Sequence, residues 1–263
     1  MKYCLCVGLH NLFFDIAIVN NRCEIVKKYK CNFDRAKDIS RNIYNAYRKY
    51  FYKYDLVGVG VGISNNIEYK DDFLYNIKSF NFDRYNLKQS LFKLFKVDIC
   101  LMEETYLASL SLSYDLRSES LLYLILDNKI SNSFVLNNEV IELDDDLNLR
   151  LSEELNNKCC KDTFKSYFLT NDLDDDCVGN YFVSNNEICK KIIAKWSKNL
   201  DVYLNKLIKE IRVDKIVFGG YLGEYLEYFK EYLLISKNVN CLCINNHREH
   251  TLKGVSHLIF KDI

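Results

Sequence analysis

The most reactive side chains in this 263-residue sequence belong to 11 cysteines and 4 histidines. Thiolates and imidazoles bind zinc, and structural zinc sites usually take paired cysteines that are separated by about two residues. Cys159 and Cys160 are adjacent instead, and His247 and His250 have no thiol or carboxylate cluster nearby that would complete a site. We therefore expect neither structural zinc nor another metal site.

Two further cysteine pairs, Cys4 with Cys6 and Cys241 with Cys243, have one residue between their members. Alternate residues of a strand point to the same face of a sheet, and a buried cysteine there behaves as a small apolar side chain. In a secreted protein the odd total would leave one cysteine unpaired. Reduced, buried thiols are the simpler interpretation, and they indicate a cytoplasmic location.

Glycines occur where close approach of the backbone matters. Gly58, Gly60 and Gly62 occupy every second position of an apolar stretch. This pattern predicts that something packs closely against one face of that strand. Gly219 and Gly220 directly follow another apolar stretch, which is typical of a turn from a strand into a helix.

Apolar periodicity predicts the elements that position these residues. In the first half we expect strands at 3–8, 12–20 and 23–31, a helix at 35–53, a strand at 56–63, a helix at 86–95, a strand at 97–101 and a helix at 103–113. In the second half we expect strands at 120–126, 131–136 and 139–143, a helical or irregular stretch at 148–169, an acidic loop at Asp172–Asp176, a helix at 185–211, a strand at 215–218, a helix at 224–234, a strand at 239–244 and a helix at 249–260.

Each half thus opens with a β meander and continues with alternating strands and helices. This repetition predicts an α/β fold with two similar lobes, each a mixed sheet flanked by helices, facing each other across a cleft. The polar stretch 115–119 suggests a boundary between lobes at 1–116 and 117–263, with the final helix able to pack back on the N-terminal lobe.

The composition narrows the classes of function. Hydrophobic residues make up 49% and charged residues 27%, as in globular proteins. Because 36 basic residues balance 36 acidic ones, no overall positive field would attract nucleic acid. No apolar run is long enough for a transmembrane helix, so we expect no membrane partner.

Several short motifs extend over nearly the whole chain: Val59–Ile63, Asn76–Phe80, Glu103–Tyr106, Ile216–Gly220 and Gly254–Ser256. In their order and spacing they resemble those of the ROK family of sugar kinases and repressors, which has the actin-like ATPase (ribonuclease H-like) fold. The resemblance implies a sugar-binding protein with two lobes.

The resemblance also implies roles for the polar residues. Glu104 stands at the position of the family's catalytic aspartate, which takes a proton from the sugar hydroxyl. Asn76 and Glu103 stand at positions that contact the sugar. The alternatives are that Glu103 and Glu104 open a helix whose dipole favours acidic residues, and that Asn76 is an ordinary turn residue.

On the nucleotide side, Gly219 and Gly220 match the family's adenosine-binding glycines, and Lys129 is positioned to contact a phosphate of Mg-ATP. The alternatives are a structural turn for the glycines and a solvated hairpin position for Lys129.

The chain departs from the family at both phosphate-binding loops. Gly8–Leu12 replaces a D-x-G-G-T motif, and Asp127–Ser131 replaces a G-T-G-x-G motif, so the glycines that let backbone N–H groups approach phosphate are lost. Our leading hypothesis is a degenerate kinase-like protein that binds a sugar with weak or no phosphotransfer. The alternatives are an active hexose or amino-sugar kinase with Glu104 as base, and a homodimeric structural scaffold.

Overall fold

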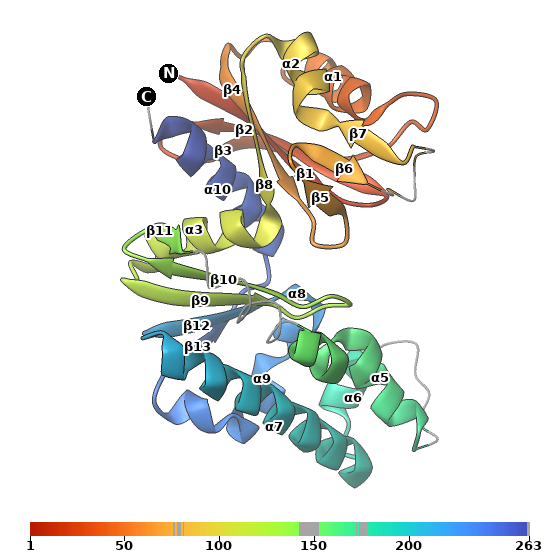
Figure 1. The fold of residues 1–263 in the computed structure, drawn as a ribbon, viewed down its shortest axis with the longest axis vertical. Coiled ribbons are helices and arrows are strands. Elements are labelled where there is room, and N and C mark those ends of the chain that lie inside the picture. The colour runs from red at the N-terminus through yellow and green to blue at the C-terminus, as the bar shows by residue number, and fades with distance from the viewer. Residues whose placement is uncertain are drawn as a thin grey trace. The chain divides into compact units, whose positions relative to one another are not determined.

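The computed structural model describes residues 1–75, 77, 80, 82–141, 153–171, 173 and 178–261. The chain forms two compact units (Figure 1). The first comprises Met1–Leu112 together with Arg248–Ile263, and the second comprises Ser113–His247. The final helix therefore belongs to the same unit as the N-terminal strands.

The first unit contains a mixed sheet with the order β3-β2-β1-β4-β8. Three antiparallel strands lead into two strands that run parallel to β1. The strands are β1 (Tyr3–Leu9), β2 (Phe13–Asn20), β3 (Ile25–Asn32), β4 (Leu56–Ile63) and β8 (Asp98–Glu103). The predicted meander and the two strands that follow it are confirmed.

Helices cover both faces of this sheet (Figure 1). Helices α1 (Ile39–Tyr50) and α2 (Leu87–Phe95) pack on the face that carries Leu5 and Val7. Helices α3 (Glu104–Leu116) and α10 (His247–Phe260) contribute apolar residues to the other face, which carries Cys4 and Cys6. Both thiols are fully buried, as the alternation in the sequence predicted.

The glycine repeat of β4 is explained by α10, which packs directly on it. A Cβ atom on Gly60 would lie 2.2 Å from Val255 Cγ1, and one on Gly62 would lie 2.3 Å from Thr251 Cγ2. On α10 itself, a Cβ on Gly254 would lie 1.9 Å from the carbonyl oxygen of Leu107 in α3. Absent side chains therefore let α10 approach both the sheet and α3 more closely than any other residue type would allow.

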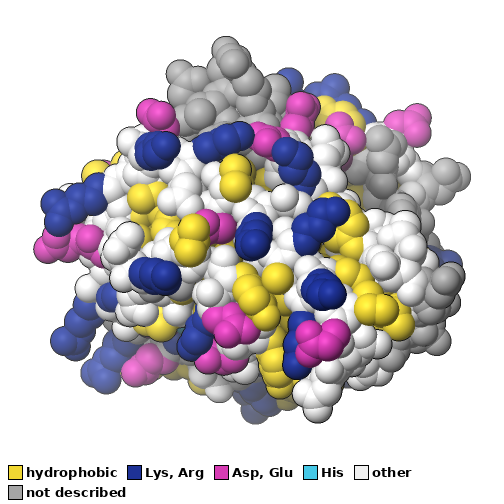
Figure 2. Space-filling model, turned by 90° about the horizontal axis from the view of Figure 1, so that it is seen from below, with side chains coloured by type: hydrophobic (Ala, Val, Ile, Leu, Met, Phe, Trp, Pro, Cys, Tyr) yellow, Lys and Arg dark blue, Asp and Glu magenta, His cyan; other side chains and the backbone are white. Residues whose placement is uncertain are grey.

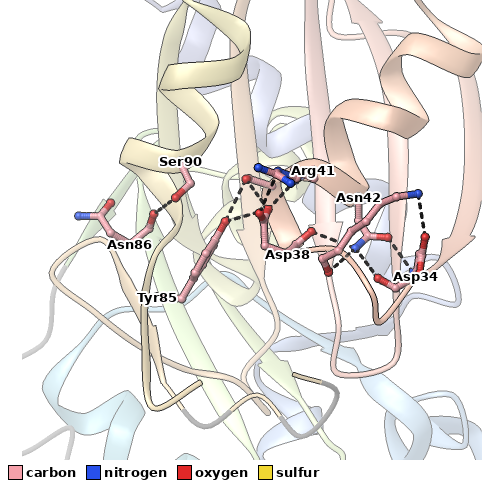
Figure 3. A network of polar contacts seen from close by, with 9 residues as sticks. Asp34, Asp38, Arg41, Asn42, Tyr85, Asn86 and Ser90 are labelled. Atoms are coloured by element: carbon pink, nitrogen blue, oxygen red, sulfur yellow. Dashed lines mark hydrogen bonds and ion pairs between the residues drawn. The ribbon is translucent and has the colours of Figure 1, made fainter. Parts of the chain in front are cut away.

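A small antiparallel sheet in the first unit consists of β5 (Glu68–Lys70), β6 (Phe73–Tyr75) and β7 (Arg84–Asn86). A polar network anchors β7 to the start of α1 (Figure 3). The Tyr85 hydroxyl lies 2.9 Å from Ser40 Oγ and 3.2 Å from Asp38 Oδ1, which also caps α1 by accepting from the Arg41 N–H. Asn42 ties the preceding loop down, because its side-chain amide donates to the Asp34 and Asp38 carbonyls.

The second unit repeats the first sheet's topology with the order β11-β10-β9-β12-β13. The strands are β9 (Ser120–Ile125), β10 (Ser131–Leu136), β11 (Glu139–Ile141), β12 (Lys215–Gly219) and β13 (Asn240–Cys243). Helices α5 (Lys161–Leu169), α6 (Gly179–Val183) and α7 (Glu187–Glu210) bury aromatic residues in this unit's core. Two mixed sheets of equal strand number, each flanked by helices, confirm the predicted α/β class.

One predicted helix is wrong. Instead of a single helix at 224–234, the chain forms short turns: α8 (Gly220–Gly223), α9 (Leu226–Phe229), η1 (Lys230–Tyr232) and η2 (Leu234–Lys237). Successive short turns bury Leu226, Phe229 and Leu233 as well as one helix would, so apolar spacing alone does not separate the two forms. The acidic loop expected at Asp172–Asp176 lies outside the described residues, except for Leu173.

Among the helices that the structure describes, none combines the length and the apolar character needed to cross a membrane.

The close packing of α10 yields a stability prediction. Gly60→Ala should destabilise the protein by about 1–3 kcal/mol, because the new methyl group forces Val255 aside. Gly8→Ala on β1 is the matched control, since its nearest neighbour would be 3.6 Å away and the change should be neutral or slightly stabilising. Urea denaturation measures both.

Adding Val255→Ala to the Gly60→Ala variant should remove the clash, so the two changes together should cost less than the sum of their separate effects. Additive costs would contradict close packing of α10 on β4.

Candidate functional site

Three parallel strands of the first unit end at the same edge of the sheet, and a polar residue follows each of them. His10 follows β1, Ser64 follows β4, and Glu104 follows β8. Ligands of open α/β sheets bind beyond the carboxyl ends of the strands. This edge is therefore the candidate site of the first unit.

Glu104 is the centre of this site. It is only 5% exposed, and its Oε1 accepts hydrogen bonds from Ser64 Oγ and from the Asn65 N–H, both at 2.9 Å. Burial raises the pKa of Glu104, although His10, these two hydrogen bonds and Arg248 act in the opposite direction. A buried carboxylate with a raised pKa can hold or accept a proton from a ligand hydroxyl.

A second buried acidic group of this unit, Asp15, lies beside His10. Asp15 on β2 is paired in register with Gly8, and it is 7% exposed. Its Oδ2 lies 3.5 Å from His10 Nε2. Both atoms are buried, and neither has a hydrogen-bond partner among the described residues. Buried polar atoms are normally satisfied, so this pair has capacity for a ligand or a water molecule.

The two turns at Gly8–Leu12 and Asp127–Ser131, which the spacing of the sequence aligns with phosphate-binding loops, use backbone donors within the chain. In the β1–β2 turn, the His10 N–H donates to the Phe13 carbonyl at 3.0 Å. In the β9–β10 turn, the Ile130 N–H donates to Asn156 Oδ1 at 2.7 Å, and the Asn156 amide returns a bond to the Ile130 carbonyl. The Asn128 N–H donates to Asp127 Oδ1 at 2.9 Å. These three donors are thus already engaged.

The other residues singled out from the sequence lie in different settings. Glu103 is exposed at the end of β8, and Lys129 is exposed in the β9–β10 turn. Gly220 has φ +78°, a left-handed conformation that favours glycine, and a Cβ on Gly219 would lie 2.3 Å from the Tyr123 hydroxyl. The fold alone therefore explains glycine at both positions. Asn76 lies outside the described residues.

Sequence reasoning missed several residues of the site. Ser64 and Asn65 directly follow a correctly predicted strand, so the rule that sites form at carboxyl ends would have found them. Asp15 depends on the register between β1 and β2, which no local motif reveals. Arg248 is brought to the site by α10, more than 200 residues from His10 in the chain.

A cavity of about 570 Å³ lies within the second unit, lined by residues of α6, α7, α9 and η1. It contains none of the residues predicted for a site. At its rim Lys230 pairs with Glu227, and Lys190 pairs with Glu187, so both lysines are already compensated. The strand edge of the first unit is the better candidate because it holds buried, unsatisfied polar groups.

No protein-family model matches this sequence, and no curated protein matches it. Solved structures do match over the full length of the chain. The ROK hexokinase of Thermus thermophilus is 13% identical, with a TM-score of 0.80 and complete coverage of both chains. A ROK-family transcriptional regulator, homologous to the Escherichia coli MLC protein, is 10% identical with a TM-score of 0.79, covering 99% of this chain and 79% of the regulator.

A ROK-family glucokinase from Streptomyces griseus, solved with glucose and AMPPNP, is 11% identical with a TM-score of 0.65, covering 98% of this chain and 99% of the glucokinase. The chain therefore has the actin-like ATPase fold of ROK proteins. Because both kinases and a regulator share this fold, the fold alone does not choose between these activities.

The raised pKa of Glu104 predicts a pH-dependent stability. Between the pKa of the unfolded chain and the higher folded pKa, the native state binds more protons, so wild-type stability falls as pH rises. Glu104→Gln lacks this loss, and its stability relative to wild type should increase as the pH rises above about 4, by about 1.4 kcal/mol for each unit of raised pKa.

Urea denaturation across this range measures the effect. Ser64→Ala removes a donor to the carboxylate, so it should extend the loss of stability to higher pH. Parallel pH profiles for wild type and Glu104→Gln would show that burial does not perturb this carboxyl group.

Proposed function

We propose that this protein binds a sugar or a closely related polyhydroxy compound at the strand edge around Glu104, and that it transfers phosphate weakly or not at all. One contrast carries the proposal. The carboxylate is kept, buried and held by two donors. Three backbone donors of the segments aligned with phosphate loops, those of His10, Asn128 and Ile130, are engaged within the chain.

The chemistry of the edge supports a ligand rich in hydroxyl groups. A hydroxyl both donates and accepts hydrogen bonds. Glu104 and Asp15 offer acceptor oxygens, and His10 offers a ring nitrogen that serves as donor or acceptor according to its tautomer. His10 Nε2 and Asp15 Oδ2 have no hydrogen-bond partner among the described residues, and the hydroxyl groups of such a ligand would supply one to each. Asn76 and Glu103 remain proposed sugar contacts.

The engaged loops support weak phosphotransfer. Phosphoryl transfer is catalysed almost entirely by positioning and by electrostatic stabilisation of the phosphates. Asn156 accepts the Ile130 N–H and donates to the Ile130 carbonyl, so phosphate would have to displace a two-point contact. The roles of Gly219, Gly220 and Lys129 toward Mg-ATP follow only if that displacement occurs.

One observation favours an active kinase as the second candidate. A catalytic base works best when its pKa lies near the operating pH, and burial moves the pKa of Glu104 upward, toward that range. In such a kinase Glu104 would take the proton of the sugar hydroxyl that attacks the γ-phosphate of ATP.

Calorimetry with a panel of hexoses and N-acetyl-hexosamines, with and without Mg-AMPPNP, tests the proposal. We expect at least one sugar to bind and no saturable binding of the nucleotide. Glu104→Ala should weaken the sugar by about tenfold or more, since a charged acceptor contributes about 1.5–3 kcal/mol. Asp98→Asn, an exposed change at the opposite end of β8, is the matched control and should bind as wild type does.

Sugar phosphorylation from Mg-ATP that is lost in Glu104→Gln would establish the second candidate instead. If neither sugar nor nucleotide binds, the proposed function is wrong.

A further inference from the structure

Three basic side chains gather around the ring of Phe13, at the rim of the candidate site. The His10 ring stacks on it with centroids 4.6 Å apart. Lys30 Nζ lies 4.0 Å from the ring centroid, and the guanidinium carbon of Arg248 lies 4.9 Å from it. These residues come from the β1–β2 turn, from β3 and from α10, so the fold and not a local run of basic sequence brings them together.

Lys30 and Arg248 are both exposed, and neither has a carboxylate within ion-pair distance in the part of the chain that the structure describes. Their sequence neighbours, in contrast, form an ion pair. Lys28 on β3 pairs with Glu249 on α10, which fixes the first turn of α10 beside β3. Glu249 is therefore already paired with Lys28 and does not compensate the charge of Lys30 or Arg248.

Elsewhere on the surface, some lysines pair locally with carboxylates, as Lys37 does with Asp34 and Lys158 with Glu154. Others lie singly over an aromatic ring, as Lys49 does over Tyr50. On the face drawn in Figure 2, basic and acidic side chains are interspersed with hydrophobic ones. Around Phe13, by contrast, two cations share one ring, whose face contributes only about 0.5–1 kcal/mol to each at an exposed site.

The acidic groups of the site are buried, whereas these two cations are exposed. Glu104 and Asp15 are each more than nine-tenths buried. His10 connects the two sets of groups, because its ring stacks on Phe13, the ring that both cations contact, and its Nε2 lies 3.5 Å from Asp15 Oδ2. Arg248 also acts on Glu104, whose pKa burial raises and Arg248 lowers. A ligand that fits this arrangement has hydroxyl groups at its inner end and a negative charge at its outer end.

We propose that the ligand of this site is an anionic sugar, one that carries a phosphate or carboxylate group in addition to its hydroxyls. Arg248 and Lys30 bind the anionic group, and Glu104 with the His10–Asp15 pair binds the hydroxyls. A guanidinium binds either anion through two parallel N–H donors. This inference rests on the proposed function and specifies its ligand class.

Calorimetry with glucose, glucose 6-phosphate, glucuronate and inorganic phosphate separates the possibilities. We expect at least one of the two anionic sugars to bind about tenfold or more tightly than glucose. Its advantage should shrink between about 0.05 and 0.3 M salt, because salt screens exposed charges. The phosphate and carboxylate sugars identify which anion is preferred, and inorganic phosphate alone should bind weakly because it has no sugar hydroxyls.

Arg248→Gln and Lys30→Gln should reduce the advantage of the anionic sugar to within about threefold of glucose, with both ligands measured on the same variant. Arg84→Gln is the matched control, because Arg84 is also exposed and its guanidinium lies 3.6 Å from the ring centroid of Phe73. This variant should keep the full preference.

The outcomes separate the two proposals. Equal affinity for glucose and for both anionic sugars would overturn the anionic ligand and leave the proposed function standing. An anionic preference that survives in Arg248→Gln and Lys30→Gln would also overturn it. If no sugar of either kind binds, both proposals fail.

Discussion

The close approach of α10 to β4 is the constraint on which the first unit depends. Gly58, Gly60 and Gly62 leave a flat strip of backbone, and Gly254 lets the helix touch the backbone of α3. A helix seated this deeply closes the second face of the sheet and buries Cys4 and Cys6. It also has a functional consequence, because the first turn of the same helix carries Arg248 to the carboxyl ends of the parallel strands. The stability of the sheet and the composition of the candidate site thus depend on the same glycines.

Local patterns were sufficient for most elements of this fold, for physical reasons that differ between strands and helices. The strand at 56–63 was predicted with its observed bounds, because β-branched residues and alternating glycines leave no competing helical period. The stretch 224–234 was predicted as one helix and forms short turns, because its packing on the core decides between forms that bury the same side chains. The glycine repeat predicted close backbone approach but not the helix responsible, which lies about 190 residues further along the chain.

In the candidate site, too, some residues could be predicted from local sequence and others could not. The resemblance in motif order indicated Glu104, and the structure shows a carboxylate that is buried and held by two donors. Ser64 and Asn65 were within reach of sequence reasoning, because they follow a well-defined strand. Asp15 and the cations around Phe13 were not, because strand register and long-range packing place them. The chain shares its fold with proteins of low sequence identity. This agrees with the distinction, because apolar packing can preserve a fold while the polar residues at strand ends change.

Two ways of binding negative charge differ in what they demand of the ligand. A glycine-rich loop presents several backbone N–H groups at short range, and these can surround the oxygens of a polyphosphate. In this chain three backbone donors of the two turns are engaged by acceptors within the chain, and positive charge at the rim of the site lies on the long side chains of Lys30 and Arg248. Such side chains are mobile and exposed, so they attract and orient a single anionic group but do not hold a transferring phosphoryl group in line with an attacking hydroxyl. Lys30 and Arg248 therefore suit recognition of a single anionic group, but they do not by themselves replace the backbone donors of a phosphate-binding loop.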